Sequence, residues 1–256
     1  MPPEVSVVLP CFEEAGHLPE LIETLEQALA RHFSGGYEVI MVATKAAGDG
    51  TPELARELAE YRPGLRRVVL QPPDRLGYGR ALTLGLDSAR GEWLLLMDAD
   101  GQFDPRDLAA LTSQMNRAEF IAGRRVQRTD PLPRLVAGAL YRVVVNTLVA
   151  LKARPTLTAA ACGALPRDLD CGFKLIRRHN LTASGRAFTS RTGVWNIEAL
   201  LRAAESGARF AEVHVRHRAR KTGRSRYSVR RGLLAGWPRP SEAMRQIFDL
   251  SRLRRS

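Results

Sequence analysis

Short apolar runs alternate with segments of helical periodicity along the first half of this chain, and that alternation limits the fold more than any other feature. Apolar runs of strand length occupy 5–9, 37–42, 68–70, 93–97 and 120–122, and helix-like segments occupy 18–33, 51–61, 80–89 and 104–116. Strands that alternate with helices usually pair in parallel, because each helix returns the chain to the same end of the sheet. We therefore expect an α/β fold with a mostly parallel central sheet, helices on both faces, and ligands at the carboxyl ends of the strands.

The run at 93–97 ends in two carboxylates, Asp98 and Asp100, with Gln102 two residues further on. Residues two apart on an extended chain point to the same side, so these three side chains are expected to face one way. Two close carboxylates repel each other unless a cation lies between them or one takes a proton. Mg²⁺ or Mn²⁺, with a phosphate completing its shell, suits such ligands. The alternative is that Asp98 and Asp104 cap a turn and the following helix, which accounts for Asp104 but leaves the Asp98–Asp100 pair without a role.

The net charge of the chain limits the kinds of partner that it can bind. Its 256 residues carry a formal net charge of +12, which favours anionic partners such as nucleotides, nucleic acid or acidic lipid. No specific nucleic-acid binding is expected, because the cations are spread widely, aromatic residues make up only 6% and no RNA- or DNA-binding motif is present. Three cysteines, an odd number without metal-site spacing, suggest a reducing compartment.

The sequence gives no sign of a signal peptide or a membrane span. The longest apolar stretch, 135–151, is interrupted by Arg142 and Asn146 and is too short to cross a bilayer. We expect a cytoplasmic protein, with peripheral contact to the anionic inner face of a membrane left open. A helix expected at 134–152 could rest on a bilayer, and a helix of the core fits its pattern equally well.

Five motifs occur in an order that resembles a known family. They are Val5-Ser-Val-Val-Leu-Pro-Cys-Phe-Glu-Glu, Asp49-Gly-Thr, Asp98-Ala-Asp-Gly-Gln, Asp168-Leu-Asp-Cys-Gly-Phe-Lys and Arg220-Lys-Thr-Gly-Arg-Ser. Together they resemble family 2 glycosyltransferases of the GT-A fold, above all the branch of polyprenyl- and dolichyl-phosphate mannose and glucose synthases. The resemblance implies one catalytic domain at 1–228, with a nucleotide-sugar half at 1–125 and an acceptor half at 126–228. A basic amphipathic tail follows at 229–256.

The resemblance also implies a role for individual residues. We assign Asp98, Asp100 and Gln102 to the metal; Pro10, Phe12, Glu14, Asp49, Arg80 and Asp98 to the nucleotide donor; Arg125, Arg220, Ser225 and Arg226 to phosphates; and Asp100, Asp168 and Glu198 to catalysis. Arg80 follows a Gly77-Tyr-Gly turn before a helix, a place that suits a phosphate. The same glycines fit a simple chain turn.

Two departures from the family pattern affect the donor site. The family usually has a Val-Asp-Asp-Gly-Ser-like run after its second strand, whereas this chain has Val42-Ala-Thr-Lys-Ala-Ala-Gly-Asp49. Lys45 cannot accept a hydrogen bond from a base N–H, so either another group recognises the base, or the donor is unusual, or donor binding is lost. Glu13 stands where the family commonly has Asn, and it adds negative charge near an anionic ligand.

The chemistry expected at this site depends on the acceptor. A divalent ion would neutralise the departing diphosphate, and the basic loop at 218–226 could close over the donor, although it also fits a solvated cationic loop. A hydroxyl acceptor needs a general base, for which Asp168 and Glu198 are candidates. Asp168 fits a turn cap as well, and Glu198 fits a helix-pairing role. A phosphate acceptor is already ionised and needs no base.

The sequence therefore predicts a metal-dependent, inverting glycosyltransferase, with inversion implied by the resemblance alone. Its partners would be a nucleotide-sugar donor and a polyprenyl-phosphate or small soluble acceptor. The alternative is a non-catalytic nucleotide- or anion-binding relative, which the altered run at 42–49 suggests.

Overall fold

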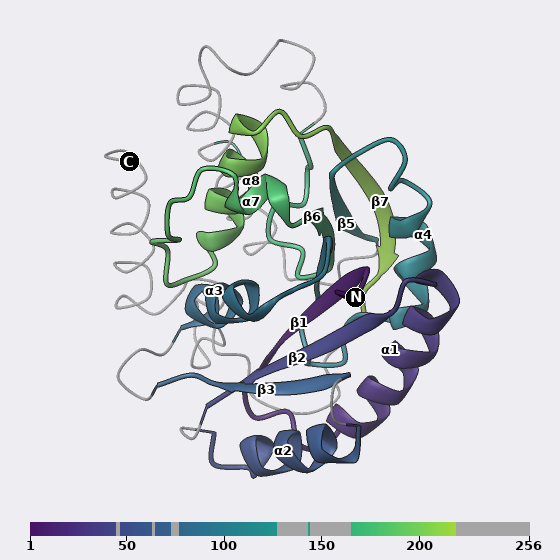
Figure 1. Ribbon diagram of the computed structural model, residues 1–256, viewed down its shortest axis with the longest axis vertical. Coiled ribbons are helices and arrows are strands. Elements are labelled where there is room, and N and C mark those ends of the chain that lie inside the picture. The colour runs from purple at the N-terminus through teal and green to yellow at the C-terminus, as the bar shows by residue number, and fades with distance from the viewer. Residues whose placement is uncertain (45–46, 63–64, 73–76, 127–142, 144–164, 219–256) are drawn as a thin grey trace, which may run out of the picture.

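The computed structural model describes residues 1–256 except for 45–46, 63–64, 73–76, 127–142, 144–164 and 219–256 (Figure 1). Within the described residues, seven strands form one sheet in the order β3-β2-β1-β4-β6-β5-β7. The strands are β1 (Val5–Cys11), β2 (Tyr37–Ala43), β3 (Arg66–Leu70), β4 (Trp93–Leu96), β5 (Phe120–Val126), β6 (Lys174–Arg177) and β7 (Phe210–Arg216). β1 pairs in parallel with β2 and β4, β2 with β3, and β5 with β7. The expected mostly parallel α/β sheet is confirmed.

One strand runs against the rest. β6 lies between β4 and β5 and is antiparallel to both. It comes from the segment after 165, so it brings late residues of the chain beside the end of β4. The four residues of this strand, Lys174 to Arg177, include only two apolar side chains, so they give no local signal of its direction.

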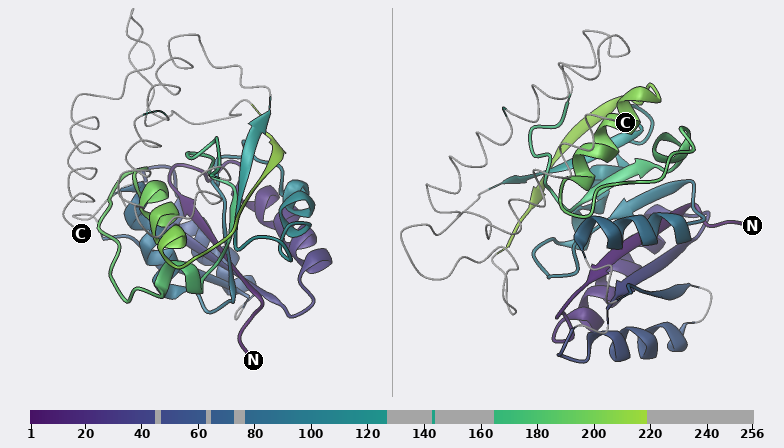
Figure 2. Two further views of the ribbon diagram at one scale, coloured as in Figure 1. Left: turned by 90° about the horizontal axis from the view of Figure 1, so that it is seen from above. Right: turned by 90° about the vertical axis from the view of Figure 1, so that its left-hand side faces the viewer.

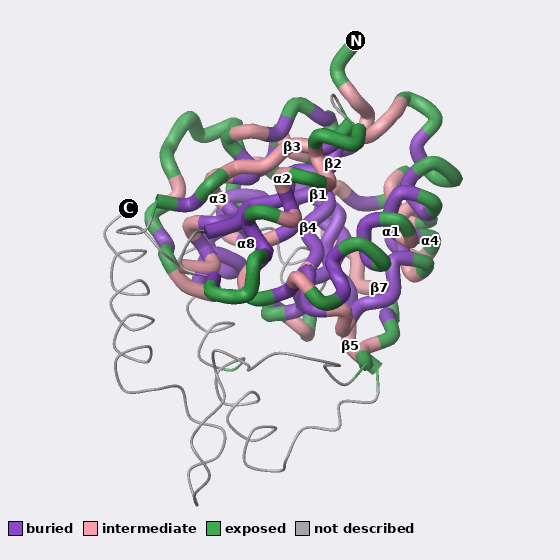
Figure 3. The backbone as a smooth tube through the Cα atoms, turned by 90° about the horizontal axis from the view of Figure 1, so that it is seen from below, coloured by how far each residue is buried: buried purple, intermediate pink, exposed green. Residues whose placement is uncertain are grey.

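Helices cover both faces of the sheet, as seen from above and from the side in Figure 2. The helices of the described part are α1 (Leu18–His32), α2 (Thr51–Tyr61), α3 (Tyr78–Ser88), the 3₁₀ turn η2 (Pro105–Asp107), α4 (Leu108–Thr112), α7 (His179–Thr182) and α8 (Trp195–Glu205). α1, α2 and α4 pack on one apolar core, and α3, α7 and α8 pack on the other. Alternate residues of each strand feed the two cores: Val7 and Leu9 face the first, whereas Val8 faces the second. Figure 3 shows the buried strands inside this double cover.

The helix expected at 104–116 and the strand expected at 120–122 have other bounds in the structure. The helix expected at 104–116 is the short turn η2 followed by α4, which ends at Thr112; Asp104 does accept a hydrogen bond from the Arg106 N–H at 3.1 Å, as a cap would. β5 continues to Val126 rather than stopping at 122, because its charged end pairs with β7. The helix expected at 134–152 and the tail at 229–256 lie outside the described residues, apart from Val143. In the part of the chain that the structure describes, no helix is both long and apolar enough to cross a membrane.

Candidate active site

Asp98 and Asp100 follow β4 at the carboxyl end of the parallel strands, as predicted. The extended geometry expected for residues 98–102 is wrong, however, because the chain bends at 99–101 and Gly101 adopts a φ of +69°. In this bend the Asp100 carboxylate, which is buried, accepts a hydrogen bond from the Gln102 N–H at 3.1 Å. The two carboxylates remain close enough for the charge of Asp100 to act on Asp98.

The surroundings of Asp98 favour a bound cation. Burial, and after it the negative charge of Asp100, together raise the pKa of its carboxyl to about 6. Tyr78, at the start of α3, donates a hydrogen bond to Asp98 Oδ1 at 2.8 Å. The other oxygen, Oδ2, lies against Gly172, where an added Cβ would overlap it. A divalent ion would relieve the repulsion between the two carboxylates, so these residues fit the predicted metal.

The third predicted ligand is oriented differently. The Gln102 side-chain amide donates to the backbone oxygen of Arg218 at 3.1 Å, and the Arg218 N–H donates to the Gln102 backbone oxygen at 2.8 Å. These two bonds anchor Arg218, at the start of the basic loop, to the turn at 98–102. Across the described residues, no three side chains of the His, Cys, Asp and Glu types gather as a metal-binding group. Metal binding by Gln102 stays a prediction.

Arg125 and Asp168 form an ion pair beside Asp98. Arg125 Nε and Nη2 donate to the two carboxylate oxygens of Asp168 at 2.8 and 2.7 Å, and both side chains are largely buried. The Asp168 N–H in turn donates to Glu212 of β7 at 3.0 Å. The positive charge of Arg125 acts on Asp98, so the predicted phosphate ligand and the predicted base are brought to the same place as the carboxylate pair.

The structure adds functional residues that the sequence did not single out. Lys174 is only 2% exposed, and its Nζ donates to Asn196 Oδ1 at 3.0 Å and to the Cys171 backbone oxygen. Burial lowers the pKa of this lysine, while neighbouring acidic groups, Asp98 among them, hold it up. Tyr78 is the other addition. The feature of the sequence that could have pointed to Tyr78 is its position between Gly77 and Gly79. These glycines let the chain pass close to the backbone of 190–192.

The predicted nucleoside-pocket residues lie in the loop that leaves β1. Pro10 is on β1 and Phe12 follows it, both partly exposed. Asp49 holds this loop in place: its Oδ2 accepts the Ala15 N–H at 3.1 Å, and its Oδ1 accepts the Thr51 hydroxyl at 2.6 Å. Partial burial raises the pKa of Asp49, but the bonds from Thr51 and Ala15 outweigh it and lower the pKa below its usual value.

Two acidic residues near the start of α1 bear on the same loop. Glu14 is buried and lies 2.9 Å from His17 Nε2, which also contacts the Ala99 backbone oxygen at 3.1 Å. Glu13 adopts a φ of +57°, a conformation that Asn tolerates better than Glu. The departure at position 13 therefore places an unfavourable residue type in a left-handed turn.

Glu198 and Arg80 lie away from the carboxylate pair. Glu198, on α8, is buried and accepts hydrogen bonds from the Ser190 N–H at 2.9 Å and from Arg202 at 2.8 Å, so both of its oxygens serve the packing of segment 189–190. Arg80 lies on α3 beside the same segment. Arg220, Ser225, Arg226 and Lys45 lie outside the described residues.

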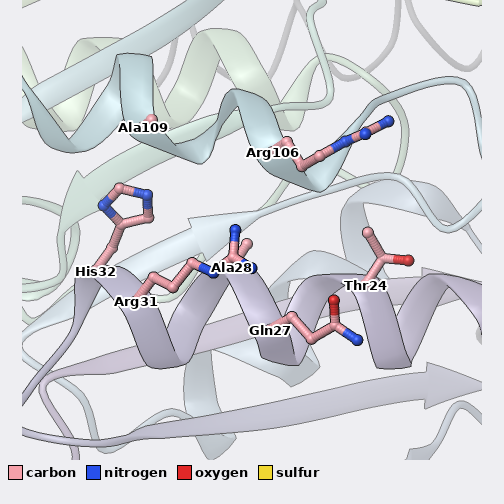
Figure 4. A pocket seen from close by; sticks show the side chains of 7 residues that line it. All are labelled: Thr24, Gln27, Ala28, Arg31, His32, Arg106 and Ala109. Carbon is pink, nitrogen blue, oxygen red and sulfur yellow. The ribbon is translucent and has the colours of Figure 1, made fainter.

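A groove lies elsewhere on the described part of the molecule. It has a volume of about 640 Å³ and runs between α1 and the η2–α4 segment, with Arg31, His32 and Arg106 among its lining residues (Figure 4). None of the residues predicted for the site lines it.

Comparison with known proteins identifies the family. The model of "Glycosyl transferase family 2" matches residues 6–182. Glycosyltransferase AglD of Haloferax volcanii is 34% identical over 214 residues, covering 83% of this chain and 32% of that protein. The dodecaprenyl-phosphate galacturonate synthase of Rhizobium johnstonii is 26% identical, covering 89% of this chain and 63% of that protein. The chain thus spans about a third of the length of the first relative and less than two thirds of the second.

Solved structures support the same fold. The glucosyl-3-phosphoglycerate synthase of Mycobacterium tuberculosis, solved with Mn²⁺, UDP-glucose and phosphoglyceric acid, superposes with a TM-score of 0.55 at 20% identity. The match covers 87% of this chain and 73% of that one. With a family match over more than half of its length and a GT-A-like sheet that ends in Asp98-Ala-Asp100, the chain belongs to glycosyl transferase family 2.

Proposed function

We propose that this protein transfers a hexosyl group from a nucleotide-sugar, with a divalent ion, to a phosphate-bearing acceptor. The observation that carries the proposal is the pair Asp98 and Asp100, one with a pKa raised to about 6 by burial and by the other. Repelling carboxylates held together at the end of parallel strands are costly without a cation. Mg²⁺ or Mn²⁺ bound there would act as a Lewis acid on the donor diphosphate.

The other residues of the site have roles that their contacts support. Tyr78 and Gly172 fix the orientation of the Asp98 carboxylate. Arg125, held by Asp168, offers its remaining donors to a phosphate. Inversion would follow if the acceptor attacks the anomeric carbon opposite the leaving diphosphate, which is the stereochemistry expected from the family.

The state of the candidate bases favours an acceptor that is already ionised. Asp168 is bound bidentately by Arg125, and both oxygens of Glu198 accept hydrogen bonds from segment 189–190 and Arg202. Either carboxylate would have to give up these bonds to take a proton from a hydroxyl. A polyprenyl phosphate, or a small phosphate monoester that attacks through its phosphate oxygen, needs no base. Some relatives are named for polyprenyl-phosphate acceptors, which agrees with this choice.

The alternative is a protein that binds a nucleotide or anion without catalysis, because the run at 42–49 lacks the usual aspartates. Calorimetric titration with UDP, GDP and TDP and their sugar conjugates, with and without Mn²⁺, separates the two. Tight, metal-dependent binding that is lost in Asp100→Ala and kept in Glu57→Ala, an exposed carboxylate of α2, supports the donor site. Binding followed by sugar transfer to a polyprenyl phosphate supports catalysis. If no nucleotide binds to the folded protein, the proposal fails.

A further inference from the structure

A second, smaller cleft lies on the outer side of α3. It has a volume of about 280 Å³ and separates α3 from segment 188–191; its lining residues are Arg80, Thr83, Leu84, Asp87, Phe188, Thr189, Ser190 and Arg191. The α3 residues that line it alternate along the helix with Ala81, Leu82 and Leu86, which pack in the core. The cleft therefore lies across α3 from the sheet, and Asp98, Asp100 and Arg125 do not line it.

Two polar groups in this cleft are withdrawn from water without a partner. Ser190 is 2% exposed, and its hydroxyl has no hydrogen-bond partner; Arg80 Nε is likewise buried and unpartnered. Among the described residues, Arg80 forms neither a hydrogen bond nor an ion pair. Buried polar groups in native proteins are nearly always hydrogen-bonded. A hydroxyl and a guanidinium N–H that lack partners, on two residues that line one cleft, point to a ligand that accepts hydrogen bonds.

We propose that this cleft binds a small phosphate monoester. A guanidinium binds phosphate oxygens through its planar fork, and the Ser190 hydroxyl supplies a further donor. Leu84 and Phe188 give the carbon part of the ligand an apolar wall, and Phe188 is fixed by stacking on Trp195, with ring centroids 4.6 Å apart. Asp87, which also lines the cleft, disfavours a second anionic group.

The cleft is preformed rather than assembled by the ligand. The Ser190 N–H is held by Glu198 at 2.9 Å, and the Gly79 N–H donates to the Arg191 backbone oxygen at 3.0 Å. Segment 189–191 is thus fixed to both α8 and α3. Its volume, at the low end for ligand pockets, fits a single phosphorylated three- or four-carbon molecule better than a nucleotide-sugar. This binding site is separate from the donor site of the proposed function.

Calorimetric titration with glycerol 3-phosphate and with inorganic phosphate, in EDTA so that the metal site takes no part, tests the proposal. Wild-type protein should bind, and Arg80→Gln should lower the affinity by about tenfold or more, because a charged phosphate contact is lost. Ser190→Ala should lower it by about fivefold, the value of one hydrogen bond. Arg31→Gln, which removes a cation from the groove between α1 and α4, should bind as the wild type does.

The results can overturn the proposal in three ways. No binding by the wild type, or equal binding by the wild type and both cleft variants, would show that the cleft takes no phosphate. The third way is a titration of UDP in the presence of Mn²⁺. If Arg80→Gln weakens the binding of UDP as much as it weakens the binding of glycerol 3-phosphate, Arg80 is a ligand of the donor instead. Ser190→Ala is expected to bind UDP and Mn²⁺ normally. Absence of nucleotide binding in the wild type would contradict the proposed function and leave this test intact.

Discussion

The carboxylate of Asp98 lies against the backbone of Gly172, so that a Cβ at position 172 would overlap Asp98 Oδ2. Gly172→Ala must therefore push the carboxylate aside. We expect Mn²⁺ affinity to fall by about tenfold or more, as for other losses of ligand orientation, and stability to fall by about 1–3 kcal/mol. Isothermal titration and urea unfolding measure the two effects.

A double-mutant cycle isolates the contact between these two residues. In an Asp98→Ala background the overlap is gone, so Gly172→Ala should cost much less stability than in the wild type. Equal costs in both backgrounds would mean that Gly172 does not restrain Asp98.

Tyr78 donates a hydrogen bond of 2.8 Å to Asp98 and so orients a carboxylate of the proposed metal site. Tyr78→Phe removes only the hydroxyl, so the fold should be kept while Mn²⁺ affinity falls by about tenfold. Tyr61→Phe is the matched control, because Tyr61 on α2 is 78% exposed. Electron paramagnetic resonance, which measures free Mn²⁺ during a titration, gives the affinities. An unchanged Mn²⁺ affinity in Tyr78→Phe would show that Tyr78 has no part in the site.

Metal binding should depend on pH through Asp98. The metal binds the ionised carboxylate, and the pKa of this group is raised to about 6. Affinity should therefore rise by up to about tenfold per pH unit below 6 and become constant above it. Mn²⁺ titrations between pH 5 and 8 measure the profile. A flat profile, or the same slope in Asp98→Asn, would contradict this assignment.

Glu38 tests the electrostatics at the opposite end of the sheet. Its carboxylate is fully buried, accepts a hydrogen bond from Ser6 at 2.6 Å and is bound by Arg90 at 2.8 Å. Burial raises the pKa of Glu38, but the bonds from Ser6 and Arg90 outweigh it and lower the pKa below 4.5. Because the folded pKa is depressed, this group contributes stability above pH 4.5 that is lost as the pH falls.

Glu38→Gln should cost about 1–3 kcal/mol of unfolding free energy at pH 7, and the cost should shrink as the pH falls below 4.5. Urea unfolding at several pH values measures it, with the exposed Glu57→Gln as the control. A cost that does not change with pH would show that the charge of Glu38 is unimportant.

The sequence predicted the first half of the fold well, because strands buried on both faces and helices with one apolar stripe have distinct periods. It placed the end of β5 too early, since the apolar run stops at 122 and the charged Arg124 and Arg125 follow. In the folded protein Arg125 is paired with Asp168, and the strand continues alongside β7. Charge pairing across distant segments leaves no local signal.

The sequence predicted only part of the site, because contacts between distant segments leave no local signal here either. Asp98 and Asp100 stand out because their spacing follows a buried strand. Tyr78 and Lys174 depend on contacts with residues at 98 and 196, which no local pattern indicates. The extended geometry failed because Gly101 takes a positive φ, and glycine allows this without requiring it.

The antiparallel strand β6 imposes an order on folding. β3, β2, β1 and β4 all come from residues before 97, and they form one side of the sheet. The strand that pairs with the outer edge of β4 begins at Lys174, so this edge has no partner strand, and Asp98 has no contact with Gly172, until that late segment has been synthesised. An open strand edge invites pairing with other chains, and non-local pairing is slow. In a nascent chain, the edge of β4 that leads to Asp98 is thus the last part of the centre of the sheet to gain a neighbouring strand.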